Sequence, residues 1–339
     1  MLPLDNKIDH TIDEFEIKGK QFYFKEMCNW NLNRSNYIKA WQSAFQRQDM
    51  EESLDWMLGT KLNKTYIIED SDGIIVSAYS MLKNNCLINK NKIDIGLCNN
   101  VFCNKKYFRY KLFDRISHLS LNNSSDYFSF AYGFPNRLAI RGHQRVGWSL
   151  PDPIKLYSYQ ISKIHSRYNS KASSEIRELN SFDSNEAKFF CEKIAQVSRE
   201  KAEESNNYRI SKTSSYYNWR FFQRNILKDR DYYICYNDSA ISFFSVYKTD
   251  PQLNILDIQW KNNSAFISMI FELINFIKTK SLPGFRFISR ELFKLLELEL
   301  PNLDINVIEQ IPLIINEFND SKAFNPQSIN LSFSDYDVY

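Results

Sequence analysis

The amino-acid sequence predicts an α/β (α+β) chain of two domains, each a mixed, mostly antiparallel sheet flanked by helices. Two observations favour this fold class. The order strand, two helices, antiparallel strands, helix, strand, helix, strand occurs once in the first half of the 339 residues and again in the second. A polar stretch rich in Ser, Lys and Asn, residues 162–174, separates the two runs. We interpret it as the boundary between a domain of residues 1–161 and a second domain of residues 175–339.

In the first half, helices are expected where apolar residues recur at helical spacing, and strands where β-branched and aromatic residues form short runs. Residues 1–20 are polar and are expected on the surface. The turn Ser71-Asp72-Gly73 between two apolar runs predicts a hairpin. The expected elements are strand 21–25, helices 36–47 and 50–58, strands 66–70, 74–79 and 92–102, helix 107–121, strand 127–132, a helix after Asn136 and a strand at 156–161.

The second half repeats this order. Its expected elements are strand 176–179, helices 183–204 and 214–222, strands 231–235, 240–247 and 253–260, helix 265–280, strand 285–289, helix 292–298 and strand 312–317. Asn262-Asn263-Ser264, without a glycine, follows the strand 253–260. We therefore expect the second half to be structural or to bind the acceptor, and the first half to hold the donor.

The junction after the strand 127–132 is the expected functional centre. Four of the eight glycines fall between Gly96 and Gly147. The strand leads into Gly133, and a helix follows Asn136. A sharp turn into a helix N-terminus is typical of a place where a ligand is held.

Composition disfavours several classes of protein. The formal net charge is +3 and the basic residues are scattered, so we expect no nucleic-acid partner. The six cysteines form no CxxC pair and have no zinc-ligand spacing, which predicts reduced thiols and no metal. The N-terminus lacks an apolar signal region, and the most apolar helix, 266–277, is too short to span a bilayer. The sequence predicts a cytoplasmic protein.

The junction resembles a motif of the GNAT acyltransferase superfamily, Asn-x-x-Ala-Ile-x-x-Tyr-x-x-x-Gly-Phe. The matching positions, without a gap, are Asn136, Ala139, Ile140, Gly147 and Trp148. The order of elements is similar to that of the superfamily too. Tyr217-Asn218-Trp219-Arg220-Phe221 and the tail 334–338 resemble segments of a branch associated with bacterial surface-sugar biosynthesis. The resemblance implies two tandem GNAT-like domains and acyl transfer from a thioester to an amine.

His143 stands where the superfamily has a tyrosine that gives a proton to the departing thiolate. The resemblance thus implies that His143 is catalytic, as a general acid with a pKa near 6.5. The alternative is a histidine that only fills the space of the tyrosine.

The resemblance implies acetyl-CoA, or another acyl-CoA, as co-substrate. It places the cofactor-binding residues at Val101, Cys103, Phe108, Arg109, Tyr110, Lys111 and Asn136. Asn136 is also a plausible helix N-cap. Phe108 to Lys111 stand where the superfamily has the glycine-rich loop that closes backbone N–H groups on a pyrophosphate. Either side chains of a basic cluster hold the phosphates, or the loop does not bind CoA; the cluster is Lys105, Lys106, Arg109 and Lys111.

Five residues are candidates for binding the acceptor: Phe134, Trp219, Arg220, Asp335 and Asp337. Phe134 and Trp219 have a core or packing role as the alternative. The two aspartates require that the tail folds back between the halves. No acidic general base is identifiable: Asp94 lies on the strand thought to face the acceptor, but an isolated aspartate on a strand is usually a solvated surface residue.

We predict an N-acyltransferase, most simply an N-acetyltransferase, whose amine acceptor lies in the groove between the halves. The branch resemblance implies an amino sugar of surface-polysaccharide biosynthesis, such as a nucleotide-linked one. One alternative is an inactive GNAT-fold scaffold. Another is an acyltransferase whose donor is an acyl carrier protein, which would meet the basic cluster with an acidic surface.

Overall fold

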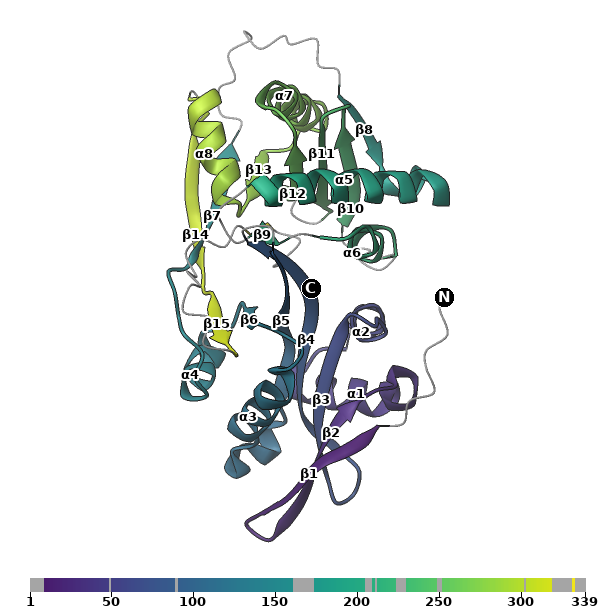
Figure 1. Ribbon diagram of the computed structural model, residues 1–339, viewed down its shortest axis with the longest axis vertical. Coiled ribbons are helices and arrows are strands. Elements are labelled where there is room, and N and C mark those ends of the chain that lie inside the picture. The colour runs from purple at the N-terminus through teal and green to yellow at the C-terminus, as the bar shows by residue number, and fades with distance from the viewer. Residues whose placement is uncertain are drawn as a thin grey trace.

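Two twisted β-sheets, one above the other in Figure 1, organise the structure. The computed structural model describes residues 9–318, 331 and 332, apart from residue 49 and the stretches 89–90, 161–173, 205–208, 211, 224–229, 249–251 and 302. Both sheets contain parallel and antiparallel neighbours and carry helices on both faces. The predicted fold class is therefore confirmed.

The first sheet has the strand order β1-β2-β3-β4-β5-β6-β15, and β9 pairs with β4. All neighbours are antiparallel except β5 and β6. The strands are β1 (His10–Ile17), β2 (Lys20–Met27), β3 (Asn63–Asp70), β4 (Ile75–Ile88), β5 (Asn91–Cys103), β6 (Phe130–Gly133), β9 (Arg209–Ile210) and β15 (Ile314–Glu317). The helices of this half are α1 (Trp30–Phe45), α2 (Glu51–Leu58), η1 (Lys105–Tyr110), α3 (Leu112–Ser124) and α4 (Arg137–Arg145).

The second sheet has the order β14-β7-β13-β12-β11-β10-β8, and its parallel pair is β12 and β13. The strands are β7 (Ile154–Gln160), β8 (Glu175–Glu178), β10 (Arg230–Tyr236), β11 (Ala240–Tyr247), β12 (Leu253–Trp260), β13 (Gly284–Phe287) and β14 (Ile305–Ile311). The helices are η2 (Leu179–Ser181), α5 (Ser184–Glu204), α6 (Ser214–Tyr217), the π-helical turn η3 (Asn218–Phe222), α7 (Asn263–Thr279) and α8 (Arg290–Glu299).

The last strand of each half lies in the sheet of the other half (Figure 1). β7 pairs with β13 and β14 of the second sheet, and β15 pairs with β6 of the first. The crossing segments meet at Ser149 and Ile315, whose backbones exchange hydrogen bonds of 2.8 and 3.1 Å. The expected membership of the strands 156–161 and 312–317 in the sheets of their own halves is wrong. The domain boundaries at 161 and 175 stay a prediction.

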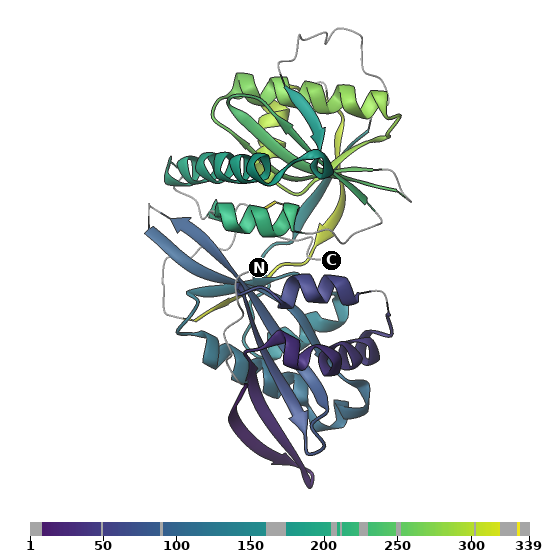
Figure 2. The same cartoon turned by 90° about the vertical axis from the view of Figure 1, so that its right-hand side faces the viewer.

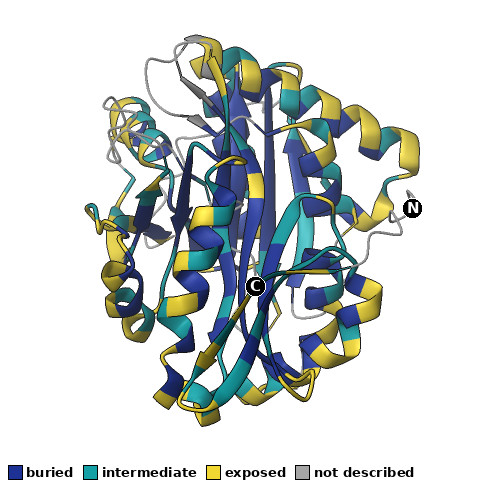
Figure 3. Ribbon diagram, turned by 60° about the horizontal axis from the view of Figure 1, so that its bottom comes forward, coloured by how far each residue is buried: buried dark blue, intermediate teal, exposed yellow. Residues whose placement is uncertain are grey.

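The helices cover opposite faces of each sheet, as the turned view in Figure 2 shows. In β3, Ile67 packs in the cluster with α1 and α2, whereas Tyr66 and Ile68 pack in the cluster with α3. This alternation follows from the two-residue period of a strand. Figure 3 shows the sheets buried between helices whose outward sides are exposed. Among the described helices, none is long and apolar enough to cross a membrane.

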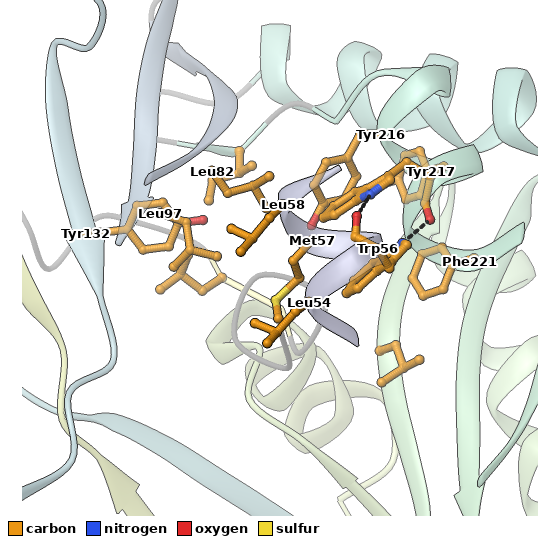
Figure 4. Close-up of a cluster of buried hydrophobic side chains, with 14 of the residues drawn as sticks. Leu54, Trp56, Met57, Leu58, Leu82, Leu97, Tyr132, Tyr216, Tyr217 and Phe221 are labelled. Atoms are coloured by element: carbon orange, nitrogen blue, oxygen red, sulfur yellow. Dashed lines mark hydrogen bonds between the residues drawn. The ribbon is translucent and has the colours of Figure 1, made fainter. Parts of the chain in front are cut away.

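One hydrophobic core joins the halves on the side of α2 and α6. The indole rings of Trp56 and Trp219 stack with centroids 4.4 Å apart and planes 9° apart. Each indole N–H donates to the backbone carbonyl of the other residue, at 2.9 and 3.1 Å. Figure 4 shows Trp56 of α2 beside Tyr216, Tyr217 and Phe221 of the second half. The halves therefore share a continuous core.

Candidate active site

Strands β5 and β6 run parallel and then separate. They pair from Ile95 with Phe130 to Cys98 with Gly133. Beyond this point β5 continues beside β4, while the chain leaves β6 and enters α4. A register shift against β4 and the left-handed backbone of Asn100 (φ 46°) bend β5 here. In the described chain no strand pairs with this edge of β5 beyond Cys98.

A cavity of about 500 Å³ lies where the strands separate. Its walls come from α1, β5, the β6–α4 junction, β11 and β15, and thus from both halves. The lining residues are Trp41, Phe45, Arg47, Leu97, Cys98, Asn99, Asn100, Val101, Gly133, Phe134, Pro135, Asn136, Ala139, His143, Tyr247 and Ile314.

Asn136 is both the N-cap of α4 and part of the cavity wall. Its side-chain oxygen accepts hydrogen bonds from the backbone N–H groups of Leu138 and Ala139, at 3.1 and 3.0 Å. The interpretation as an N-cap is confirmed. Cofactor binding by Asn136 stays a prediction, although its place in the wall permits it.

Glycine allows α4 to pack closely on α3. A Cβ at Gly142 would lie 2.6 Å from the ring of Phe113, so only glycine fits without a shift. The same ring contacts His143. Close packing of the two helices therefore positions the imidazole.

His143 is buried in an aromatic environment, with 3% of its surface exposed. Its ring meets those of Tyr79, Phe113 and Trp148 at steep angles, with centroids 6.2, 5.3 and 5.3 Å away. Nδ1 is buried and has no hydrogen-bond partner in the described chain. Burial lowers the pKa of His143 to about 4.

The expected pKa near 6.5 is therefore wrong for folded His143, because the aromatic rings exclude the water that would solvate an imidazolium. At pH 7 the imidazole is neutral and lines the cavity. It can take a proton released during the reaction and return it, but it does not start as a charged acid. Its catalytic role stays a prediction.

The turn before α3 differs from the glycine loop of the resemblance. η1 is a 3-10 turn whose backbone is satisfied locally: the Asn104 side chain accepts from Lys106 N–H, and the Asn104 carbonyl accepts from Tyr107 N–H. Lys111 N–H donates to the Phe108 carbonyl, and Lys111 enters α3 with a left-handed backbone (φ 53°). These N–H groups are not arranged to close on a pyrophosphate.

The side chains of the turn divide into buried and exposed sets. Tyr110 is buried, with its ring 5.4 Å from that of Phe22. Arg109 donates to the Tyr110 hydroxyl at 2.6 Å. Phe108, Arg109 and Lys111 face solvent, as do Lys105 and Lys106. The exposed cations could hold the phosphates of CoA through their side chains. Both this outcome and the loss of CoA binding stay predictions.

The two remaining predicted cofactor residues, Val101 and Cys103, differ in their relation to the cavity. Val101 lines the cavity. Cys103 does not: it is half-buried at the end of β5, and burial raises its pKa to about 11. Among the described residues, no group of three or more His, Cys, Asp or Glu side chains is placed to hold a metal ion.

Of the predicted acceptor residues that the structure describes, Phe134 alone lines the cavity. Trp219 is buried in the stack with Trp56, and Arg220 is 1% exposed with its guanidinium 5.3 Å from the Trp56 ring centroid. Neither Trp219 nor Arg220 lines it, because the π-helical turn directs them into the shared core. Asp335 and Asp337 lie outside the described residues.

Sequence reasoning missed the α1 and second-half walls of the cavity. Trp41 and Phe45 come from the end of α1, Arg47 from the segment after it, Tyr247 from β11 and Ile314 from β15. The helical spacing of Trp41 and Phe45 indicates a buried stripe and nothing about a cavity. The contribution of Ile314 follows from the strand exchange, which no local pattern signals.

In the described part of the second half, β12 and β13 also diverge, but the cavity directly beyond them is small. β12 and β13 pair only at Leu253 and Asn254, and the described cavity beyond them is about 30 Å³. Buried Asp257 occupies this place and accepts hydrogen bonds from Lys212 Nζ at 2.7 Å and Tyr217 OH at 3.2 Å. An ion pair and its neighbours fill the position that the cavity has in the first half.

The fold as a whole resembles that of known structures. No protein-family model matches the chain. No curated protein sequence matches it. The fold resembles that of a GCN5-related N-acetyltransferase from Anabaena variabilis, with 14% identity, a TM-score of 0.65 and coverage of 87% of this chain and 73% of that one. A probable N-acyltransferase from Enterococcus faecalis is 12% identical, with a TM-score of 0.64 and coverage of 88% of this chain and 73% of that one.

A third similar structure is a GCN5-related glucosamine N-acetyltransferase region in a fungal multi-domain β-N-acetylglucosaminidase. It is 11% identical, with a TM-score of 0.56, and the match covers 87% of this chain and 38% of that one. At these identities the likeness concerns the fold. The chain has the fold of the GCN5-related N-acetyltransferases.

Proposed function

We propose that the protein is an N-acyltransferase that moves an acyl group, acetyl in the simplest case, from a thioester to an amine. The observation that carries this proposal is the cavity at the divergence of β5 and β6, with His143 in its wall. The fold shared with acetyltransferases supports it.

The donor of the proposed reaction is a thioester on a pantetheine arm, as in acetyl-CoA. The arm is a chain of amide and methylene groups. It matches a site that lies beside the part of β5 that no described strand joins on that edge, and that offers apolar side chains such as Leu97 and Ile314 for the methylenes.

The proposed acceptor is an amino sugar. Rings of Trp41, Phe45 and Tyr247 can pack against the apolar face of a sugar, and Arg47 and Asn99 bring polar side chains to the same cavity. The branch resemblance implies a sugar of surface-polysaccharide biosynthesis. The similar fungal region is a glucosamine N-acetyltransferase, which agrees with this class.

In the reaction, the neutral amine attacks the carbonyl carbon of the thioester and the carbon–sulfur bond breaks. The nitrogen loses one proton and the sulfur gains one. We assign the transfer of this proton to His143, whose neutral imidazole at pH 7 can accept it from nitrogen and give it to the thiolate.

The test is product formation from acetyl-CoA with a panel of amino sugars, free and nucleotide-linked, followed by mass spectrometry. We expect an N-acetylated product, and we expect His143→Ala to lower kcat by about 100-fold. His143→Tyr should retain more activity because a phenol can serve the same transfer. Equal turnover of the wild type and both variants would remove His143 from the mechanism. If neither acetyl-CoA nor a carrier-bound thioester gives a product, the alternative of an inactive GNAT-fold scaffold is favoured.

A further inference from the structure

The outer side of α4 carries cations that the cavity does not use. Asn136, Ala139 and His143 form the inner side, which lines the cavity. At about 100° per residue, Arg137 and Arg141 lie on the opposite side of the helix, and both are exposed. A small molecule bound in the cavity therefore contacts the inner side and leaves these arginines to another partner.

α4 packs on α3, the helix that directly follows η1 in the chain. Arg145 at the end of α4 pairs with Asp114 in the first turn of α3, at 2.8 Å, and Lys111 begins that helix. Figure 1 shows α3 and α4 on the same side of the first half. We call this surface the basic face; its residues are Lys105, Lys106, Phe108, Arg109, Lys111, Arg137, Leu138 and Arg141.

Charge is concentrated on the basic face. Residues 105–111 and 137–145 hold seven Lys and Arg and no Asp or Glu, in a chain whose formal net charge is +3. Within the described chain, Lys105, Lys106, Lys111, Arg137 and Arg141 form no ion pair or side-chain hydrogen bond. Unpaired cations at this density repel one another, so an anionic partner would stabilise them.

Two apolar side chains project from the same surface. Leu138 is 92% exposed between the arginines of α4, and Phe108 is 60% exposed between the cations of η1. Exposed apolar side chains surrounded by charge are typical of protein docking sites. A surface that only held phosphates would not need them.

We propose that the basic face docks an acidic acyl carrier protein, which delivers the acyl group on its phosphopantetheine arm into the cavity. Negative charges on the carrier meet the cations, and apolar side chains on the carrier cover Leu138 and Phe108. η1 fits this donor, because a carrier-borne arm ends in a single phosphodiester and needs no backbone cradle for a pyrophosphate. The assignment of the arm to the cavity rests on the proposed acyltransferase function, whereas the docking itself does not.

The experiment measures binding of a free-standing acidic acyl carrier protein in its apo form, which has no arm, by titration calorimetry. The test variant is Arg137→Glu/Arg141→Glu on α4. The matched control is Arg290→Glu/Lys294→Glu on α8, which reverses two exposed cations at the same positions of the helix in the other half.

We expect the wild type and the control to bind the carrier equally and the test variant to bind at least about tenfold more weakly. Binding should weaken as salt is raised, because ions screen exposed charges. Transfer from acetyl-pantetheine should be unchanged in the test variant, since neither arginine lines the cavity.

Absence of carrier binding by the wild type, or equal binding by the test variant, would overturn the docking proposal. So would binding of anionic vesicles or RNA, but not of the carrier, through the same arginines. Carrier binding without transfer from any thioester would sink the acyltransferase proposal and leave the docking site standing.

Discussion

Burial alone sets the protonation of His143. No acid or base lies among the causes of its pKa shift, and the surrounding rings of Tyr79, Phe113 and Trp148 offer little solvation to a charge. In the unfolded chain a histidine has a pKa of about 6.5. The folded protein therefore binds the proton more weakly than the unfolded chain, and acid favours unfolding.

The pH dependence of stability should report this difference. Stability from His143 is fully present above pH 6.5 and is lost as the pH falls through about 4. The loss should amount to about 3 kcal/mol. Urea unfolding of the wild type and of His143→Phe between pH 4 and 7 measures this loss. The free energy of unfolding should fall less steeply with acid in the variant, because it lacks the imidazole. His118→Gln, at an exposed position on α3, controls for removal of an imidazole. Parallel profiles of wild type and His143→Phe would show that His143 is not held neutral.

At the residue scale, the sequence predicted the N-cap of α4 and placed His143 at the functional junction, but it did not predict the environment of the imidazole. The N-cap role of Asn136 follows from a local pattern, and it is confirmed. The pKa of His143 depends on rings from β4, α3 and the segment after α4, so the spacing around position 143 alone does not give it.

At the scale of elements, strands with strong apolar patterns were predicted best. The strand 253–260 has the expected bounds, because β12 is buried along its whole length and apolar Leu253, Ile255, Leu256, Ile258 and Trp260 dominate its sequence. β1 was missed because only Ile12, Phe15 and Ile17 of its eight residues pack inward. β14 was missed because most of its side chains are exposed, as on an edge strand.

The segment 217–221 was predicted as a helix with an acceptor role, whereas its tryptophan joins the halves. Trp219→Ala should remove a stacked, doubly hydrogen-bonded ring from the shared core and lower the free energy of unfolding by about 3–5 kcal/mol. Trp219→Phe keeps a ring for the stack and should cost less.

Urea unfolding measures both variants. Phe189→Ala removes an exposed ring on α5 and should change stability by less than about 1 kcal/mol. A cost for Trp219→Ala no larger than that of this control would show that the contact between the tryptophans does not hold the halves together.

At the scale of the molecule, the exchange of β7 and β15 makes each half depend on the other. β15 also brings Ile314 into the cavity, and β11 brings Tyr247. The repeated order of elements was visible in the sequence, but the sheet that a closing strand joins depends on contacts between distant parts of the chain. The exchange therefore had to come from the structure.

A cut in the chain within residues 161–173 tests this dependence. We expect the two fragments to co-purify when they are expressed together, because β7 and β15 each lie in the sheet of the other fragment. Expressed alone, each lacks a strand and should show no cooperative unfolding by circular dichroism. A fragment that unfolds cooperatively by itself would contradict the exchange as a requirement for folding.

The most direct test of the proposed thioester site is the binding of acetyl-pantetheine, measured by saturation-transfer NMR, because every proposed donor contains this group. The wild type should transfer saturation to the methylene protons of the arm. Ala139→Phe, which fills the cavity from the inner side of α4, should abolish the signal, and Leu138→Phe on the exposed side should keep it. Equal signals from the two variants, or none from the wild type, would contradict the placement of the thioester between β5 and α4.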